Sequence, residues 1–345
     1  MKRGGFEAFL VTSLVNVRYL GGFKCSYGRM LFAGGQGYLL LDSRYTAAAR
    51  RAAAGVEVVE ITASTIDDKV REILQSHKLR RLAFEKSAVT HAEFLDLRAK
   101  LRGITLLPSE GLVEDLRIIK HEKEVAAIHR ACRLGDRAFK HILGVIRPGI
   151  TERQVSAALD SFMMSLEVDG LAFESIVASG PRGAFPHAVP SSRKIQNGDL
   201  VTLDFGVCLD GYNSDMTRTV AAGKPGGRTV QLYRAVQRAQ AEALAAARPG
   251  MRASDLDAVA RAALDKDGFG KYFTHGLGHG VGLEVHEAPR IGAFSKAVLK
   301  KGMIITVEPG VYVEGLTGAR IEDTAVVTAD GAQALTHSPK KLITL

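Results

Sequence analysis

The chain has 345 residues, 46% of them hydrophobic and 24% charged, a composition that excludes a disordered protein and a length that predicts two domains. No run reaches the ~18–20 consecutive apolar residues of a membrane-spanning helix, so we expect no membrane partner. The net charge of +9 is diffuse, with 17 basic and 13 acidic residues before residue 116 and 29 and 24 after it. No Lys/Arg tract alternates with aromatic residues, which predicts no nucleic-acid partner.

Residues 1–115 alternate strand-like apolar runs with amphipathic helical segments. The predicted strands cover residues 6–13, 29–35, 36–43, 56–61 and 80–85, and the predicted helices cover 43–55, 65–77 and 91–103. This βαβ rhythm predicts an α/β domain with a mixed or parallel sheet.

The first residues and the cysteines bear on location. Two basic residues precede an apolar stretch, as in a secretory signal, but Glu7 interrupts that stretch and no small-residue cleavage site follows. The three cysteines, Cys25, Cys132 and Cys208, form neither a disulfide framework nor a Cys-x-x-Cys metal site. We therefore expect mature protein from the start, in the reducing cytoplasm.

A second domain is predicted from residue 116 to 345, with two helix pairs. The predicted helices cover residues 118–146, 150–170, 229–247 and 254–267. Thr151 and Gln154 have the spacing of a capping box at the start of the second helix. The first and third helices both end at Arg-Pro-Gly, at residues 147–149 and 248–250, which suggests an internal duplication of roughly 100 residues.

Residues 199–220 predict a β-hairpin. Apolar and β-branched runs flank Asp210-Gly211, a dipeptide suited to a two-residue type I′ turn. With these two residues as the loop, Leu209 pairs with Tyr212, and the register of every other pair follows.

That register brings two acids together. Asp204 falls opposite Thr217, so Asp215 becomes its diagonal neighbour on the same face, roughly 5–8 Å away. Carboxylates at that distance repel and raise one pKa, so a bound cation is a natural reason to keep both ionised. Two solvated acids on an exposed face are the alternative.

Further candidate ligands lie downstream. Residues 302–327 predict two apolar strands joined by a glycine-rich loop, with Glu308 in the first and Glu322 in the second. A strand acid is costly to bury unless it is paired or coordinated. Residues 274–287 hold three histidines among glycines that let the backbone pass close to a ligand, namely His275, His279 and His286.

Together these segments resemble the pita-bread metallopeptidases, the family of methionine aminopeptidase, aminopeptidase P and prolidase. The eleven-residue interval between Asp204 and Asp215 matches that family. Residues 1–115, with NVRYLGGF and LLLDSRYTAAA, resemble the creatinase-type N-terminal domain of aminopeptidase P and prolidase. The resemblance implies an α/β (α+β) protein with a creatinase-like domain over 1–115 and a pita-bread catalytic domain over 116–345.

The resemblance also implies a site with two divalent metal ions. The implied ligands are Asp204, Asp215, His279, Glu308 and Glu322. Such an oxygen-rich set favours Mn²⁺, with Co²⁺ or Zn²⁺ as alternatives. Glu308 would also act as the general acid/base.

Five more residues are candidates around these ligands. By resemblance, His286 would donate to the oxyanion, His187 and His275 would contact substrate, and Arg320 would support Glu322 or a nearby carboxylate. His187 and His286 are thus catalytic candidates beside Glu308. Tyr212 is a candidate pocket residue, with cross-strand packing as the alternative.

The implied activity is hydrolysis of Xaa-Pro bonds in peptides with proline at the second position, by a homodimer. A dipeptidase needs a cation for the free carboxylate, and the short segment between His286 and Glu308 has only Arg290 and no closing insertion. Sequence therefore favours an Xaa-Pro aminopeptidase, with Xaa-Pro dipeptidase as the alternative. More distant alternatives are a creatinase-like C–N hydrolase and a non-catalytic binding module, both of which would lack the intact ligand set.

Overall fold

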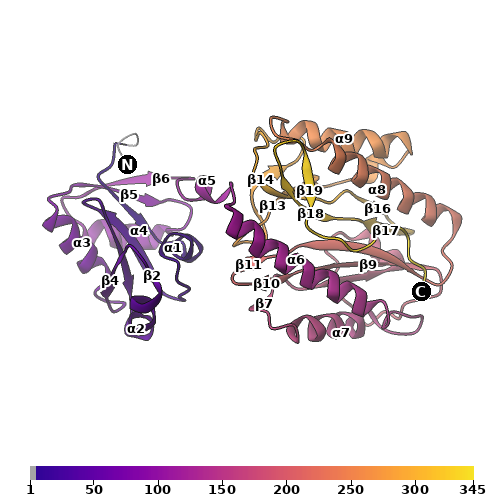
Figure 1. Cartoon of the computed structure of the whole chain (residues 1–345), viewed down its shortest axis with the longest axis horizontal. Helices are drawn as coiled ribbons and strands as arrows, with labels where there is room; N and C mark the ends of the chain where they lie inside the picture. The colour runs from indigo at the N-terminus through magenta and orange to yellow at the C-terminus, as the bar shows by residue number, and fades with distance from the viewer. Residues whose placement is uncertain (1–4) are drawn as a thin grey trace. The chain divides into compact units, whose positions relative to one another are not determined.

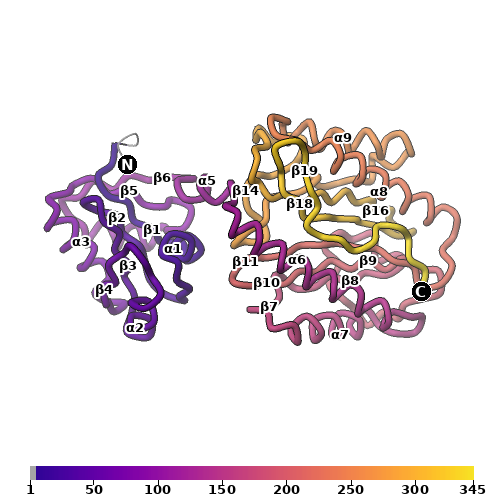
Figure 2. The backbone as a smooth tube through the Cα atoms, viewed as in Figure 1, coloured from indigo at the N-terminus to yellow at the C-terminus, as the bar shows by residue number. Residues whose placement is uncertain are grey.

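The computed structural model describes residues 5–345, which divide into two compact units with the boundary after Arg117 (Figures 1 and 2). Lys2 and Arg3, which belong to the expected mature N-terminus, lie outside the described residues. Among residues 5–345, no helix is long and apolar enough to cross a membrane. Each unit has its own sheet and its own hydrophobic core.

The first unit is built on a six-stranded mixed sheet with the order β4-β3-β2-β1-β5-β6. Its strands are β1 (Ala8–Val11), β2 (Gly28–Ala33), β3 (Gln36–Leu41), β4 (Glu57–Glu60), β5 (Arg81–Glu85) and β6 (Thr105–Ser109). Its helices are α1 (Leu14–Gly21), α2 (Ser43–Ala52), α3 (Ile66–Ser76), α4 (His91–Lys100) and α5 (Glu114–Arg117). β1 pairs antiparallel with β2 and parallel with β5, which confirms the predicted α/β character.

Helix α1 is absent from the sequence prediction. Its eight residues continue the apolar run of β1, so periodicity alone does not separate them from a strand. The structure ends the helix at Gly22, whose positive φ of 65° forms a left-handed cap.

The second unit carries four long helices and two broken hairpins. The helices are α6 (Glu122–Ile142), α7 (Glu152–Met164), α8 (Gly227–Ala246) and α9 (Ala253–Lys266), with the short 3-10 helices η1 (Gly180–Ala184) and η2 (Gly270–Tyr272). The strands are β7 (Gly170–Leu171), β8 (Ile176–Ser179), β9 (Asp199–Phe205), β10 (Val207–Leu209), β11 (Tyr212–Asn213), β12 (Met216–Ala222), β13 (Gly278–Gly280), β14 (Glu287–Ile291), β15 (Ile304–Val307), β16 (Gly310–Val313), β17 (Thr317–Arg320), β18 (Asp323–Val327) and β19 (Ala332–Ala334).

The two helix pairs cover different sheets. Apolar residues of α6 and α7 share a core with β9 and β12, which form a three-stranded sheet with β8. Apolar residues of α8 and α9 share a core that includes β15 and β18 residues of the five-stranded sheet β14-β13-β15-β18-β19 (Figure 1). The Thr151 capping box predicted for α7 is present.

Both Arg-Pro-Gly segments make the same kind of contact. The Gly149 N–H donates to the carbonyl of Ile195 at 2.8 Å, and the Gly250 N–H donates to the carbonyl of Leu299 at 2.9 Å. Two isolated bridges follow in equivalent places, Thr151 with Lys194 and Arg252 with Val298. This agreement supports an internal duplication.

The first hairpin keeps the predicted register but is broken in the middle. Leu209 pairs with Tyr212, and Asp204 pairs with Thr217. At Gly206 a Cβ atom would lie only 1.9 Å from the Ser214 carbonyl oxygen, so the strands bend past each other there. The outer part, β10 and β11, therefore joins β7 in a separate sheet.

The second hairpin is broken in the same way, which corrects the predicted pair of strands. β15 pairs with β18 and β16 with β17, in one continuous register that puts Glu308 level with Glu322. Neither glutamate lies inside a strand, because Pro309 has no N–H for the ladder and the pairing stops at that point.

Candidate metal centre and active site

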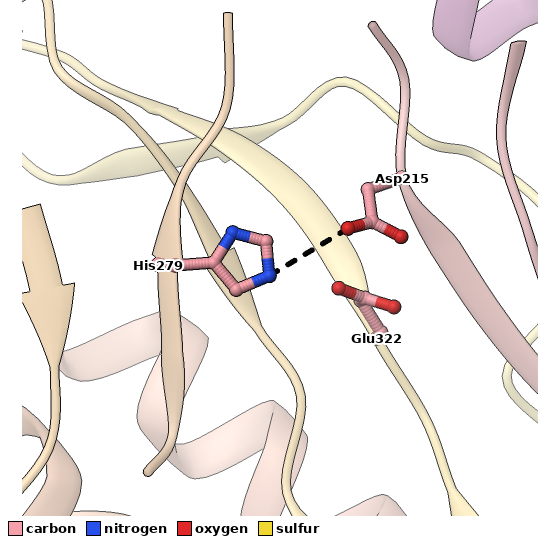
Figure 3. Close-up of side chains that lie close together, drawn as sticks. All are labelled: Asp215, His279 and Glu322. Carbon is pink, nitrogen blue, oxygen red and sulfur yellow. Dashed lines mark ion pairs between the residues drawn. The ribbon is translucent and has the colours of Figure 1, made fainter. Parts of the chain in front are cut away.

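The five predicted ligands line one pocket in the second unit. Ligand-type atoms of Asp215, His279 and Glu322 lie within 4.8 Å of one another, and Figure 3 shows the three side chains pointing toward a common point. His279 Nε2 also lies 3.3 Å from Glu308 Oε1. Asp204 lies opposite Thr217, as its register requires, and joins the group from β9.

The breaks in the two hairpins position most of the acids. Asp215 lies in the break before β12, and Glu308 and Glu322 lie in the break between β15/β18 and β16/β17. Where the ladder stops, side chains and backbone leave the regular up-and-down alternation, so acids from two sheets converge.

Burial and mutual repulsion disfavour the state in which Asp204, Asp215 and Glu322 are all ionised. Burial raises the pKa of Asp204, and burial together with the charge of Asp204 raises the pKa of Asp215 well above its usual value. Burial, followed by the charge of Asp215, also raises the pKa of Glu322 well above its usual value. A divalent cation relieves this kind of repulsion.

His279 presents a ring nitrogen to the acids. Its Nδ1 lies 3.0 Å from the Gly280 carbonyl oxygen, and because a carbonyl only accepts, Nδ1 carries the proton of the neutral ring. Nε2 then faces Asp215 Oδ2 at 3.6 Å. Burial lowers the pKa of His279, but the Glu308 hydrogen bond and the Asp215 charge outweigh it and raise the pKa to about 9. Burial raises the pKa of Glu308, but the hydrogen bond with His279, together with the charges of His279, His275 and Arg320, outweighs it and lowers that pKa.

Two buried carboxylate oxygens have no hydrogen-bond partner within residues 5–345, Asp204 Oδ1 and Glu322 Oε1. An unsatisfied buried acceptor costs about 1–3 kcal/mol. The other oxygen of each group is held: Asp204 Oδ2 accepts from Arg320 Nη2 at 2.5 Å, and Glu322 Oε2 accepts from Thr217 Oγ1 at 2.8 Å. Each acid thus offers one oxygen to a cation, and the donor set fits a hard, oxygen-preferring divalent ion.

Arg320 connects the acids to His275 through Tyr312. Arg320 Nη1 donates to the Tyr312 hydroxyl at 2.9 Å, and that hydroxyl lies 2.8 Å from His275 Nε2. His275 Nδ1 lies 2.8 Å from the Gly276 carbonyl, so Nε2 is the acceptor of the Tyr312 proton. Burial lowers the pKa of His275, which favours this neutral ring. The contact of Arg320 with Asp204 identifies the carboxylate that it supports.

The pocket has a volume of about 1010 Å³. Its apolar wall includes Phe173, Ile176, Phe185 and Pro186, and its polar wall includes His187, His275, His286 and Arg290. The His286 ring lies 4.3 Å from that of His279, and burial followed by the His279 charge lowers the pKa of His286. The pocket therefore offers room for a small apolar group beside the acids.

Tyr212 lies apart from the residues that line this pocket. Its hydroxyl donates to Glu124 Oε1 at 3.0 Å, and its ring packs with the buried Ile128 and Cys132. Tyr212 therefore supports the contact of β11 with α6, in line with the packing alternative.

Two residues at the site, Tyr312 and Thr217, were not assigned a role from sequence, and Arg290 was considered there only as a cation for the free carboxylate of a dipeptide. Continuous pairing of residues 304–326 would have placed Tyr312 diagonal to Arg320, because Tyr312 pairs with Gly318. Arg290 lines the pocket and makes no salt bridge or hydrogen bond within the described part of the chain.

The chain belongs to metallopeptidase family M24, whose sequence profile matches residues 126–329. The profile of the creatinase/prolidase N-terminal domain matches residues 1–119. These matches confirm the resemblance to the pita-bread peptidases with a creatinase-type N-terminal domain. The family is one of metallopeptidases, which use divalent metal ions.

Full-length relatives are peptidases. The chain is 41% identical over 341 residues to the peptidase YqhT of Bacillus subtilis, covering 99% of this chain and 96% of the relative. A structure of the Xaa-Pro dipeptidase from Bacillus anthracis superposes with a TM-score of 0.97 at 38% identity, covering 100% and 96%. The X-Pro aminopeptidase from Thermotoga maritima superposes with a TM-score of 0.94 at 33% identity, covering 100% and 99%.

Proposed function

We propose that this chain is a dinuclear metallopeptidase that hydrolyses Xaa-Pro bonds, with free Xaa-Pro dipeptides as preferred substrates. The observation that carries the hydrolytic part is the cluster of four acids and one imidazole in the pocket, with Asp204 Oδ1 and Glu322 Oε1 unpartnered. The names of the relatives support the choice of proline substrates.

The proposed ligands are Asp204, Asp215, His279, Glu308 and Glu322. The five side chains carry nine ligand atoms, of which Arg320 and Thr217 hold two, and the remaining seven exceed the roughly six positions around one octahedral ion, which supports two ions. The oxygen-rich set supports Mn²⁺ over Co²⁺ or Zn²⁺. Bound divalent ions would lower the pKa of water and polarise the scissile carbonyl.

The side chains move the protons. Glu308 accepts a proton from the attacking water and passes it to the proline nitrogen as the C–N bond breaks. His286 donates its N–H to the developing oxyanion, and its lowered pKa does not remove that N–H. His187 and His275, which also line the pocket, contact the substrate, His275 by van der Waals contact because Gly276 and Tyr312 hold both of its ring nitrogens.

Arg290 supports the choice of dipeptides. It is an exposed cation on the wall of the pocket, without a carboxylate partner in residues 5–345. The free carboxylate of a dipeptide lies close to the scissile bond and would supply that partner. This placement favours the dipeptidase alternative over the aminopeptidase expected from sequence.

Xaa-Pro aminopeptidase is the second candidate. The segment between His286 and Glu308 forms β14, a connecting loop and β15, without an added element that closes the pocket. The Thermotoga maritima X-Pro aminopeptidase shares the fold over the whole chain. A longer peptide would then extend past Arg290.

Substrate comparison tests both candidates. Protein treated with a chelator and reloaded with Mn²⁺, Co²⁺ or Zn²⁺ is assayed on Xaa-Pro, Xaa-Pro-Yaa and Xaa-Ala. We expect activity only after reloading, higher kcat/KM on Xaa-Pro than on Xaa-Pro-Yaa, and little turnover of Xaa-Ala. Higher kcat/KM on Xaa-Pro-Yaa would favour the aminopeptidase, and no turnover of either proline substrate would refute the proposed function.

The expected homodimer and cytoplasmic location stay predictions from sequence. Light scattering during gel filtration tests the first, and cell fractionation tests the second.

A further inference from the structure

Helix α9 contacts the backbone that carries His275, although it contributes no residue to the pocket. Two of its charged residues, Asp257 and Arg261, lie one turn apart, and Arg261 Nε donates to Asp257 Oδ2 at 2.6 Å. Asp257 is buried, with 1% of its side chain exposed, whereas Arg261 is 32% exposed. A buried acid on an otherwise amphipathic helix needs partners, and these lie on the segment that precedes β13.

Arg261 holds two backbone carbonyls of that segment. Its Nη1 donates to the Phe273 carbonyl at 3.0 Å, and its Nη2 donates to the His275 carbonyl at 2.6 Å. Its guanidinium also lies 4.4 Å from the centre of the Phe273 ring. That ring meets the His275 imidazole edge-on, at 5.0 Å between centroids. Arg261 therefore fixes both the backbone of His275 and the ring packed against it.

Asp257 holds the other end of the segment. Its Oδ1 accepts the Leu277 N–H at 3.0 Å, and the Leu277 carbonyl accepts the Glu308 N–H at 2.8 Å. One turn of α9, from Asp257 to Arg261, is therefore connected through the backbone of residues 275–277 to both His275 and Glu308.

Residues 273–277 are also packed closely against the end of strand β14. A Cβ at Gly276 would lie 2.7 Å from the Ile291 carbonyl oxygen, so the backbone there runs tightly against the end of β14. Hydrogen bonds from α9 and close packing against β14 therefore hold His275 from two opposite directions.

We propose that Arg261 and Asp257 are positioning residues that hold residues 273–277, and through them His275 and Glu308, in the geometry that the reaction requires. They touch neither substrate nor reacting atoms. The inference rests on the proposed function for its kinetic consequence, but the positioning itself is measurable without activity.

The test compares two arginines on neighbouring helices. Arg261→Gln removes the bonds to the Phe273 and His275 carbonyls. Arg238→Gln is the matched control, because Arg238 on α8 pairs with Glu242 at i,i+4 and with Asp267, away from the pocket. We expect Arg261→Gln to lower kcat/KM roughly 10- to 100-fold, the scale of a misplaced group, with Arg238→Gln near wild type.

A double-mutant cycle separates positioning from general destabilisation. If Arg261 acts through His275, then Arg261→Gln adds little to the loss caused by His275→Gln. Additive losses in this cycle overturn the proposal. So does a wild-type kcat/KM in Arg261→Gln, measured where thermal unfolding shows that all variants are folded.

A measurement on the metal-free protein keeps the two proposals apart. In ¹H–¹⁵N spectra of ¹⁵N-histidine protein, with the His275 ring assigned through His275→Gln, we expect Arg261→Gln to shift the His275 ring signals and Arg238→Gln to leave them. Unchanged His275 signals in Arg261→Gln overturn the positioning role. Wild-type protein that hydrolyses no Xaa-Pro substrate refutes the proposed function alone.

Discussion

Thr217 and Glu322 bind each other twice across the first and second hairpins. The Thr217 hydroxyl donates to Glu322 Oε2 at 2.8 Å, and the Glu322 N–H donates to the Thr217 carbonyl at 3.1 Å. The same hydroxyl accepts from Arg320 Nε at 3.0 Å. The uncharged side chain of Thr217 therefore orients both the Glu322 carboxylate and the Arg320 guanidinium.

Thr217→Val tests this role with almost no change of shape. The valine leaves Glu322 Oε2 and Arg320 Nε without their shared partner, and such outer partners typically contribute 10- to 100-fold to metal affinity, so we expect a loss of about that size. Calorimetric titration of metal-free protein with Mn²⁺ measures it. Thr202→Val on the neighbouring strand is the control, because Thr202 bonds only to the Thr219 hydroxyl among the described side chains. Equal affinities for both variants would contradict the role of Thr217.

Asp215→Asn should abolish hydrolysis and spare the fold. Burial and Asp204 raise the pKa of Asp215, so a neutral amide relieves repulsion in the metal-free protein. We expect the unfolding temperature without metal to stay level or rise, and the stabilisation by added Mn²⁺ to shrink. Thermal unfolding with and without Mn²⁺, beside an activity assay, checks this. Turnover at the wild-type rate would remove Asp215 from the proposed ligands.

Arg290→Gln should change selectivity for the substrate's C-terminus. Loss of a charge-assisted bond of roughly 1.5–3 kcal/mol predicts about a 10- to 100-fold lower kcat/KM on Xaa-Pro. The amide Xaa-Pro-NH₂, which has no carboxylate, should be cleaved equally by both proteins. Steady-state kinetics on the two substrates gives the result, and an equal loss on both would show that Arg290 does not recognise the carboxylate.

Glu152 makes part of the stability depend on pH. This fully buried carboxylate accepts from the N–H and hydroxyl groups of Ser179 and Ser191, at 2.6–3.0 Å, and from Arg182 Nε at 2.9 Å. Burial raises the pKa of Glu152, but the hydrogen bonds from Ser191 and Ser179 outweigh it and lower the pKa. The contribution of Glu152 to the free energy of unfolding is therefore complete above its pKa in the unfolded chain, about 4.3. It is lost as the pH falls through the lower pKa of the folded protein.

Glu152→Gln should therefore destabilise the protein most at neutral pH. We expect a constant loss between pH 8 and about pH 5, and a smaller difference from wild type below about pH 4. Urea unfolding at each pH measures the loss, with the exposed Glu167→Gln as control. Because Glu152 ties down residues on both sides of His187, a rise in KM should accompany the loss. If the difference in the free energy of unfolding between Glu152→Gln and wild type grew as the pH fell, the pKa of Glu152 would not be lowered in the folded protein.

Sequence could predict the first hairpin because its signals are local. Asp210-Gly211 determines the turn, both residues have positive φ (53° and 78°), and counting back gives Asp204 opposite Thr217. The second hairpin has no such two-residue turn, and Pro309 divides it, so the facing positions of Glu308 and Glu322 required the structure.

Contacts between segments that lie far apart in the sequence could not be predicted from sequence patterns. Arg320 was expected near Glu322 or another acid, and only the fold identifies Asp204, which is 116 residues away. Tyr212 carries the same residue-type signal as Tyr312, yet Tyr312 bonds to His275 and Tyr212 to Glu124. Side-chain identity and spacing do not distinguish the two tyrosines, because the difference lies in which sheet each strand joins.

The duplication has a consequence for how the site is assembled. One repeat supplies Asp204 and Asp215, and the other supplies His279, Glu308 and Glu322, so neither contains a complete coordination shell. The ion pairs Arg320–Asp204 and Arg218–Asp323 already join the repeats, and a shared ion would add a further cross-link between them. Expressed as two fragments, this unit would be a complementation pair whose affinity rises with added metal, because the ions bind only where both repeats contribute ligands.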